Sequence, residues 1–146
     1  MSQERRINHR LISYWEALKG RRNFASESDI DIEELSDIWS SCFLIKVDHI
    51  DGKHALKFTY LGQDLIEAFS NDFTGLNFDS QVESSYGIML NKTAMEVLSI
   101  KEPVVVEDEF TNDKNLLIKS RYCMLPLSDD DININYILGG MKWRDF

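Results

Sequence analysis

Two of the three histidines in the sequence flank a predicted turn. The dipeptide Asp51-Gly52 favours a two-residue β-hairpin turn, because both central residues of such a turn need positive φ. With that turn, His49 and His54 become directly opposed cross-strand neighbours whose Cβ atoms lie about 4.5–5.5 Å apart. Two imidazoles at this spacing could bind one divalent ion beside Asp51. The sequence therefore contains a metal candidate, but two sure ligands make only a weak site.

Other patterns that carry chemistry are incomplete in this sequence. The acidic run beginning at Asp29 lacks the glycine and the final glutamate of a calcium loop, since Glu34 and Ser40 occupy those positions. The glycine–lysine pair after the predicted turn lacks the upstream glycine of a phosphate-binding loop. Neither Cys42 nor Cys123 has a sequence cue for a thiolate nucleophile. The motifs therefore do not indicate an enzyme.

The composition describes one acidic, folded domain. The 146 residues carry 16 Lys and Arg against 25 Asp and Glu, a formal net charge of −9, and 43% of them are hydrophobic. At about 150 residues per domain, there is no room for a sensor plus a separate catalytic module. The negative charge argues against nucleic acid and membrane partners, because binding to phosphates depends on Lys and Arg. We expect a cytoplasmic protein with reduced thiols, since the polar N-terminus shows no signal region and no apolar run approaches the roughly 18 residues of a membrane span.

Hydrophobic periodicity places helices and strands along the chain. Leu11, Trp15 and Leu18 recur at helical spacing and predict an amphipathic helix that Asn8 caps and Gly20 ends. The same reasoning predicts three further helices and five strands, the helices at 31–40, 63–70 and 85–101 and the strands at 42–48, 54–61, 104–110, 116–127 and 133–143. Strand hairpins on both sides of a helical block imply an α+β fold, with an antiparallel sheet that the middle helices cover on one face.

The register of the first hairpin follows from its turn. It opposes three apolar pairs on one side of the sheet, namely Val47 with Leu56, Ile45 with Phe58, and Phe43 with Tyr60. A shift of one residue would separate all three pairs. We therefore expect these six side chains to face the core.

Four short strings resemble the PAS domain family, in the right order over nearly the whole chain. They are Tyr14-Trp15-Glu16-Ala17-Leu18-Lys19-Gly20, Asp72-Phe73-Thr74-Gly75, Leu125-Pro126-Leu127-Ser128-Asp129-Asp130 and Leu138-Gly139-Gly140. They are similar to strings in stand-alone bacterial PAS proteins, whose chains open with a Tyr-Trp helix. The resemblance implies a PAS-like five-stranded antiparallel sheet with a helical crossover on one face and N-terminal helices. It also places Asp131 where a turn glycine is usual, so we expect the last hairpin to differ in shape.

The resemblance also divides the chain. Residues 1–40 would form an N-terminal helical extension that packs on a PAS-like domain of residues 41–146, in a single globular unit. In proteins of this kind the N-terminal helix often forms a dimer. The candidate interface of a homodimer is therefore Leu11, Tyr14, Trp15 and Leu18.

A pocket between the concave face of the sheet and the crossover helices is a further implication of the resemblance. Periodicity supplies candidate lining residues from both sides: Phe43, Ile45, Phe58, Tyr60, Phe69, Phe73, Met89, Val97 and Tyr122. This lining suits a small apolar or planar ligand that a few polar groups hold in place. The same residues fit a core that is packed solid.

Cofactors bound by other PAS domains require residues at particular places. A flavin-type photosensor needs a cysteine in an Asn-Cys-Arg string on the crossover, whereas Cys42 and Cys123 both fall on predicted strands. A haem sensor needs an axial histidine on the long helix, and His9, His49 and His54 lie elsewhere. The sequence therefore identifies no cofactor and argues against haem and covalent flavin.

Three classes of function remain. We favour a non-catalytic sensory or regulatory PAS domain that binds a small molecule or a signalling protein partner and responds by a shift in conformational populations. The first alternative is a protein-interaction adaptor with a filled core. The second is a small isomerase-like enzyme, for which Asp108 is the one candidate base because it shares the strand parity of Val104 and Val106.

Overall fold

The structure, a computed structural model, describes residues 3–77 and 84–145. Its helices are α1 (Gln3–Lys19), the 3₁₀ helices η1 (Glu27–Asp29), η2 (Ile32–Leu35) and η3 (Trp39–Ser41), α2 (Gln63–Phe69) and α3 (Ser85–Ile100). Its strands are β1 (Cys42–Ile50), β2 (Lys53–Leu61), β3 (Val104–Thr111), β4 (Leu117–Leu127) and β5 (Tyr136–Asp145). Within the described ranges, no helix is both long and apolar enough to cross a membrane.

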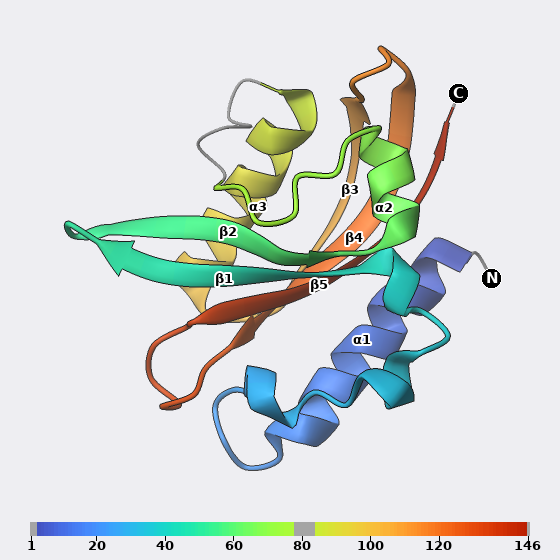
Figure 1. The fold of residues 1–146 in the computed structure, drawn as a ribbon. Helices are drawn as coiled ribbons and strands as arrows, with labels where there is room; N and C mark the ends of the chain where they lie inside the picture. The colour runs from blue at the N-terminus through green and yellow to red at the C-terminus, as the bar shows by residue number, and fades with distance from the viewer. Residues whose placement is uncertain (1–2, 78–83, 146) are drawn as a thin grey trace.

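All five strands form one antiparallel sheet in the order β2-β1-β5-β4-β3. The first hairpin and the last three strands therefore meet in the middle of the sheet, where β1 pairs with β5. Figure 1 shows α2 and α3 on one face of the sheet, called the inner face below, and α1 across the other, called the outer face. The predicted α+β class, with five antiparallel strands and a helical crossover on one face, is confirmed.

The first hairpin turns at the predicted dipeptide. Asp51 and Gly52 adopt φ values of 52° and 77°, which is the backbone that this turn requires. Ile45 opposes Phe58, as predicted, and the neighbouring inward pair, Val47 with Leu56, is also confirmed. The side chains of both pairs are buried in the core.

The predicted pairing of Phe43 with Tyr60 is wrong. A β-bulge beside Leu44 shifts the register, so that Phe43 opposes Leu61 and Tyr60 opposes Leu44. Because a shift of one residue moves a side chain to the other face, Tyr60 leaves the inner face. Its ring stacks on Trp39 at a centroid distance of 4.6 Å, and its hydroxyl donates to the Trp39 carbonyl at 2.8 Å.

The segment predicted as a helix at 31–40 forms the short turns η2 and η3 instead. Asp31 does cap η2, since its carboxylate accepts the Glu33 N–H at 3.0 Å. One apolar side chain of the segment, Leu35, is fully buried. Contacts with the rest of the protein, rather than local helical preference, therefore set the path of this segment.

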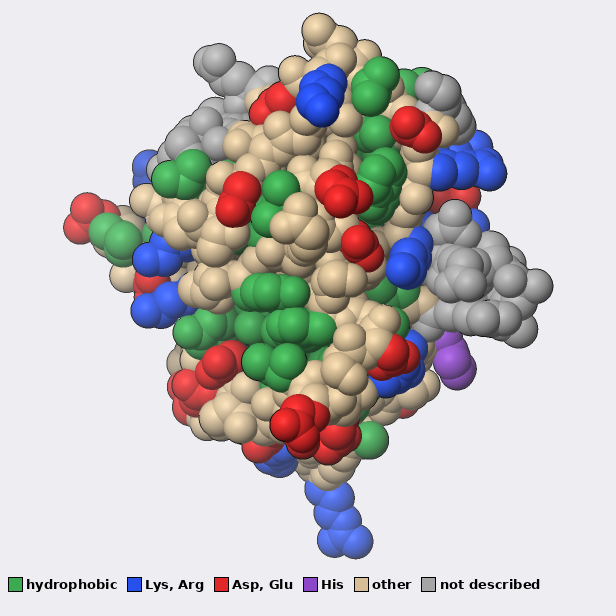
Figure 2. All heavy atoms as spheres, turned by 45° about the vertical axis from the view of Figure 1, so that its right-hand side comes forward, with side chains coloured by type: hydrophobic (Ala, Val, Ile, Leu, Met, Phe, Trp, Pro, Cys, Tyr) green, Lys and Arg blue, Asp and Glu red, His purple; other side chains and the backbone are tan. Residues whose placement is uncertain are grey.

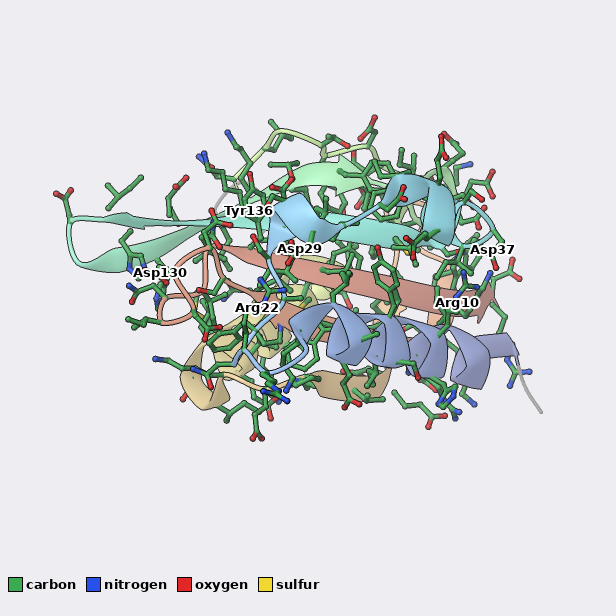
Figure 3. The ribbon with its side chains drawn as sticks, turned by 90° about the horizontal axis from the view of Figure 1, so that it is seen from below. Arg10, Arg22, Asp29, Asp37, Asp130 and Tyr136 are labelled. Atoms are coloured by element: carbon green, nitrogen blue, oxygen red, sulfur yellow. The ribbon has the colours of Figure 1, made fainter. Side chains whose placement is uncertain are left out.

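Two ion pairs fasten this segment to α1 and to the loop that follows it. The side chains of Arg10, in the middle of α1, and Asp37 approach to 2.6 Å, and those of Arg22, in the loop after α1, and Asp29 of η1 approach to 2.6 Å (Figure 3). The hydrogen bond from Arg22 lowers the pKa of the Asp29 carboxyl below its ordinary value. Charged contacts thus join residues 29–37 to the middle of α1 and to the loop after it.

The start of α1 differs from the prediction. The helix begins at Gln3, so Asn8 lies inside it and is not its cap. The Asn8 side chain faces the protein and is 6% exposed. Its Oδ1 is buried and has no hydrogen-bond partner among the described residues. The predicted end of the helix is confirmed, since α1 stops at Lys19 and Gly20 has a φ of 57°.

The last hairpin contains a non-glycine residue in a glycine-like conformation. Asp131, which stands where a turn glycine is usual, has a φ of 63°. Its carboxylate accepts the backbone N–H groups of Asn23 and Phe24, both at 3.0 Å. The aspartate therefore makes the turn and also ties the loop after α1 to it.

Candidate functional site

Aromatic rings form a continuous cluster between the inner face and the crossover. Six of them, each at most 2% exposed, are in the cluster: Phe43, Phe58, Phe69, Phe73, Tyr86 and Phe110. Neighbouring ring centroids lie between 4.9 and 6.1 Å apart, the range in which aromatic pairs attract each other. The first four rings were predicted to line a pocket. Their mutual packing is what a filled core produces, so a guest would have to separate them.

The remaining predicted lining residues are also buried, apart from Tyr60 on the other face. Ile45, Val97 and Tyr122 have no exposure and Met89 has 7%. The Tyr122 hydroxyl lies 2.6 Å from Thr93 Oγ1 on α3, so its polar group already has a partner inside the chain. Burial raises the pKa of Tyr122 to about 12. This tyrosine is a neutral hydrogen-bonding group at physiological pH.

Tyr86 is a member of the cluster that the sequence reasoning missed. Its hydroxyl donates to Asp113 Oδ2 at 3.0 Å and accepts from Asn71 Nδ2 at 3.3 Å. Burial raises its pKa. Helical spacing could have identified it, because Tyr86 precedes Met89 and Leu90 by three and four residues on the buried side of α3. It links α3 to the β3–β4 turn and to the end of α2.

The histidine pair forms as the turn predicted. His49 and His54 are directly opposed and exposed, and their ring centroids lie 4.5 Å apart. Among residues 3–77 and 84–145, no three His, Cys, Asp or Glu side chains are grouped as a metal site would require. The hairpin therefore supplies two nitrogen ligands and no more from the described part of the chain.

Both cysteines lie on strands, as predicted, and their thiols are buried. Cys42 lies at the start of β1, where its thiol donates to the Ile38 carbonyl at 3.3 Å, and Cys123 lies on β4. Burial raises the pKa of both thiols. They are therefore protonated and poorly placed to act as nucleophiles.

The candidate base of an isomerase lies at an exposed position. Asp108 is exposed on β3, and its carboxylate accepts the N–H of the next residue, Glu109, at 2.8 Å. A general base must lie within hydrogen-bonding reach of a bound substrate. The geometry of Asp108 gives no support to catalysis in the inner core.

The residues predicted to form a dimer interface pack largely within the chain itself. Leu11 has no exposure and Trp15 has 5%, and the Trp15 indole N–H donates to a β4 carbonyl at 2.7 Å. The Tyr14 hydroxyl accepts the N–H of Asp31, while Leu18 is half-buried. Leu11 and Trp15 are therefore unavailable to a second copy while α1 stays on the sheet. Figure 2 shows exposed hydrophobic side chains gathered on one side of the molecule, next to Asp and Glu side chains.

Two neighbouring glycines on β5 allow side chains to pack closely against the strand from both faces of the sheet. A Cβ at Gly139 would lie 2.0 Å from the Phe43 ring, and one at Gly140 would lie 2.4 Å from Leu11 Cδ1. Successive residues of a strand face opposite sides. The inner aromatic cluster and α1 therefore both rest directly on the same stretch of β5 backbone.

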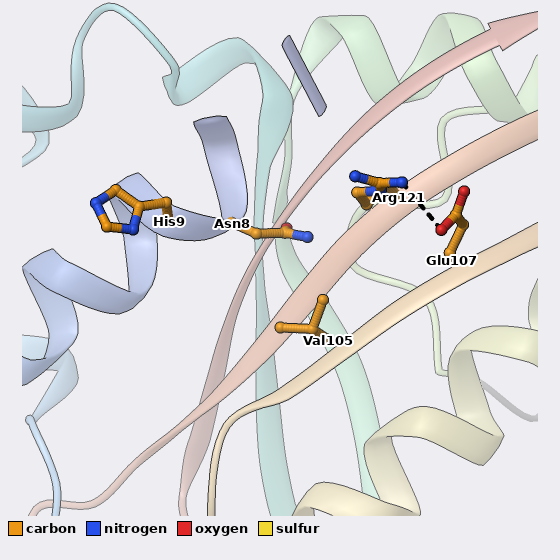
Figure 4. Close-up of a pocket in the computed structure, with 5 residues that line it drawn as sticks. All are labelled: Asn8, His9, Val105, Glu107 and Arg121. Carbon is orange, nitrogen blue, oxygen red and sulfur yellow. Dashed lines mark ion pairs between the residues drawn. The ribbon is translucent and has the colours of Figure 1, made fainter. Parts of the chain in front are cut away.

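A separate pocket lies on the outer face and was not predicted. It has a volume of about 490 Å³, and the residues that line it are Asn8, His9, Val105, Glu107 and Arg121 (Figure 4). Arg121 Nη2 lies 3.0 Å from Glu107 Oε2. The residues come from α1 and from the β3–β4 hairpin, which is far from α1 in sequence, so no local pattern could have found this group.

This arrangement of one antiparallel sheet between a helical crossover and an N-terminal helix defines a PAS-type sensory fold. A sequence model of the PAS domain matches residues 3–142, and the chain belongs to the PAS domain family. Domains of this family are in general sensory and not catalytic. No curated protein matches the chain in sequence.

Solved structures of photoreceptor and channel domains share the fold. The chain is similar to a light-oxygen-voltage domain studied with a flavin analogue, at a TM-score of 0.55 and 12% identity over 77% of this chain and 83% of that one. A variant of the fungal photoreceptor VVD gives a TM-score of 0.54 and 15% identity, with 90% and 92% covered. The PAS domain of the fruit-fly ELK potassium channel gives 0.53 and 14%, with 76% and 92% covered. At these identities the likeness concerns the fold alone.

Proposed function

We propose that this chain is a sensory PAS domain whose inner aromatic cluster receives the signal and whose α1 helix transmits it. The glycine pair on β5 carries this proposal. Phe43 packs on Gly139 from the inner face, and Leu11 packs on Gly140 from the outer face. Because protein interiors are close-packed and transmit strain, a displacement of Phe43 would move the β5 backbone at Gly139 and Gly140 and, through it, Leu11 of α1.

The signal in this proposal is a small apolar or planar molecule, or a protein partner, that binds at the inner face and crossover. Its effect requires different affinities for two arrangements of α1, since a ligand shifts an equilibrium only by its differential affinity. The buried aromatic rings supply the apolar contact area for such a ligand. The two free thiols support the expected location in a reducing, cytoplasmic compartment.

Native mass spectrometry of the purified protein tests whether a small molecule is bound. We expect an adduct that is lost on denaturation, and a difference in Trp15 fluorescence between the adduct-bearing protein and protein refolded without it. Trp39→Phe and Trp143→Phe leave Trp15 as the single reporter. A mass equal to the chain alone, with identical Trp15 spectra before and after refolding, would contradict small-molecule sensing.

Variants of the cluster separate binding from transmission. Phe43→Leu removes the ring from Gly139 and should abolish the Trp15 response. Met89→Leu, a nearly volume-conserving change elsewhere in the lining, is the matched control and should retain it. A Trp15 response that survives Phe43→Leu unchanged would show that the signal does not pass through Gly139.

The second candidate function is an adaptor with a filled core. The contacts among the six rings favour it, because close packing needs no guest. In that case a protein partner alone acts on α1. The expected homodimer would then use surface other than Leu11 and Trp15, and light scattering of the purified chain measures its mass directly.

A further inference from the structure

The outer-face pocket lies on the opposite side of the sheet from the aromatic cluster, so what it binds is independent of the function proposed above. It occupies about 490 Å³ between α1 and the strands β3 and β4 (Figure 4). That volume is within the range of sites for small molecules, about 300–1,000 Å³. One wall is apolar, because Val105 on β3 is 55% exposed. The other walls carry an amide, an imidazole and an ion pair.

Asn8 is the most informative residue of this pocket. Its helical neighbours Ile7 and Leu11 are buried apolar residues, whereas Asn8 places an amide at 6% exposure beside them. The amide does not cap α1, and Oδ1 has no partner among the residues described. A buried amide without a hydrogen bond destabilises a fold. Figure 4 shows the Asn8 side chain extending from α1 toward the strands, with its amide nitrogen at the tip.

Arg121 and Glu107 supply opposite charges side by side. They are cross-strand partners on β4 and β3, and their side chains remain 25% and 61% exposed. The guanidinium has five N–H donors. The ion pair with Glu107 is made by Nη2. On its other side Arg121 opposes Lys142 of β5, whose ammonium group donates to Ser41 Oγ at 3.2 Å.

We propose that the outer-face pocket binds a free amino acid. Its carboxylate accepts hydrogen bonds from Arg121, in the paired geometry that guanidinium and carboxylate groups favour. Its ammonium group donates to the Glu107 carboxylate, and the Asn8 amide nitrogen donates to the ligand carboxylate beside Arg121. Its side chain packs on Val105. The zwitterion thus matches the ion pair and the amide together.

The twenty free L-amino acids are the probes of this proposal. Isothermal titration calorimetry with each, up to about 10 mM, should find at least one that binds saturably with one site per chain. The N-acetyl and C-amide derivatives of that amino acid each lose one charged group, so each should bind about tenfold to a hundredfold more weakly. The N-acetyl derivative lacks the ammonium group and the C-amide lacks the carboxylate.

Two pocket variants and one control locate the site. Asn8→Leu and Arg121→Leu should each weaken binding about tenfold to a hundredfold. Arg144→Leu makes the same change at an exposed position of β5 that does not line the pocket, and should bind like the wild type. Because leucine replaces an unpartnered amide with an apolar group of similar branched shape, Asn8→Leu should leave the melting temperature unchanged or raise it.

Three results would overturn the proposal. They are the absence of saturable binding for all twenty amino acids, binding that survives both pocket variants, and a melting temperature that Asn8→Leu lowers. The last would show that the Asn8 amide stabilises the fold and is not kept for a ligand.

Discussion

Replacing Gly139 by alanine brings two opposing effects into one measurement. Glycine within a strand is less favourable than alanine by about 0.5–1 kcal/mol, so the backbone alone predicts that Gly139→Ala stabilises the protein. The structure predicts the opposite sign. The new Cβ would lie 2.0 Å from Phe43 Cζ, and the ring is backed by Phe58 at a centroid distance of 5.6 Å. Overpacking of this kind costs about 1–3 kcal/mol, so the clash wins.

The expected result is a loss of about 1–2 kcal/mol in the free energy of unfolding, measured by urea titration with circular dichroism. For a chain of this size that corresponds to a fall of about 2–8 °C in melting temperature. Combining Gly139→Ala with Phe43→Leu should cost less than the sum of the two single changes, by about 0.5–3 kcal/mol, because the smaller side chain makes room.

Gly140→Ala is the matched control for this cycle. It is the same substitution at the next residue of the same strand, but its Cβ meets Leu11 Cδ1, the end of a flexible side chain, on the outer face. Its effect should be smaller and should add to that of Phe43→Leu within about 0.5 kcal/mol. A stabilised Gly139→Ala protein, or strict additivity with Phe43→Leu, would refute the direct contact on which the route to α1 depends.

Three further changes have expected outcomes that the contacts define. Thr93→Val leaves the buried Tyr122 hydroxyl without its partner and should lower the free energy of unfolding by about 1–3 kcal/mol in urea titration; adding Tyr122→Phe should recover most of that loss. Trp15→Phe removes a buried indole hydrogen bond of 2.7 Å and should lower the free energy of unfolding by about 1–3 kcal/mol in the same assay. An unchanged urea midpoint would contradict the packing of α1 against β4. Arg22 lowers the pKa of Asp29, and a depressed carboxyl adds stability above its unfolded pKa of about 3.9 that is lost as the pH falls through the folded value. Between pH 5 and about 2 the melting temperature of the wild type should therefore fall more steeply than that of Asp29→Asn, and equal slopes would contradict this assignment.

The first hairpin was predictable because a turn signal and strand alternation agreed on one register. The dipeptide at Asp51 fixed the turn, and the inward pair of Ile45 with Phe58 followed from it. The bulge beside Leu44 had no such signal, because no glycine or other local marker accompanies it. The bulge occurs where β1 also pairs with β5, a strand remote in sequence. It places Tyr60 where its ring stacks on Trp39.

The N-terminal region was less predictable for a related reason. The apolar periodicity correctly placed the buried side of α1, but it could not show that the helix starts five residues before Asn8. Local capping preferences suggested a helix at 31–40, whereas contacts across the fold produced 3₁₀ turns. The sequence therefore predicts that Asn8 caps the helix, whereas in the structure its Oδ1 is buried inside α1 without a hydrogen-bond partner among the described residues.

The candidate site was predictable where it coincides with the core. Phe43, Phe58, Phe69 and Phe73 are apolar at core spacing, and burial alone brings them together. Phe110 could have been added from its strand parity with Val104 and Val106. The outer-face pocket was not predictable, because it depends on where α1 lies relative to the β3–β4 hairpin, and no local sequence pattern records that placement.

The burial of α1 limits how this domain can transmit a signal. Ile7, Leu11 and Trp15 are at most 5% exposed, and burying each such side chain stabilises the fold by about 1.5–3 kcal/mol. Releasing the helix would therefore cost roughly 5–9 kcal/mol, which is comparable to the whole stability of a typical domain, about 5–15 kcal/mol. A ligand that released α1 would need a differential affinity of that size. A small displacement of α1 over Gly140 needs a far smaller differential affinity, so the proposed transmission favours a helix that moves while it remains on the sheet.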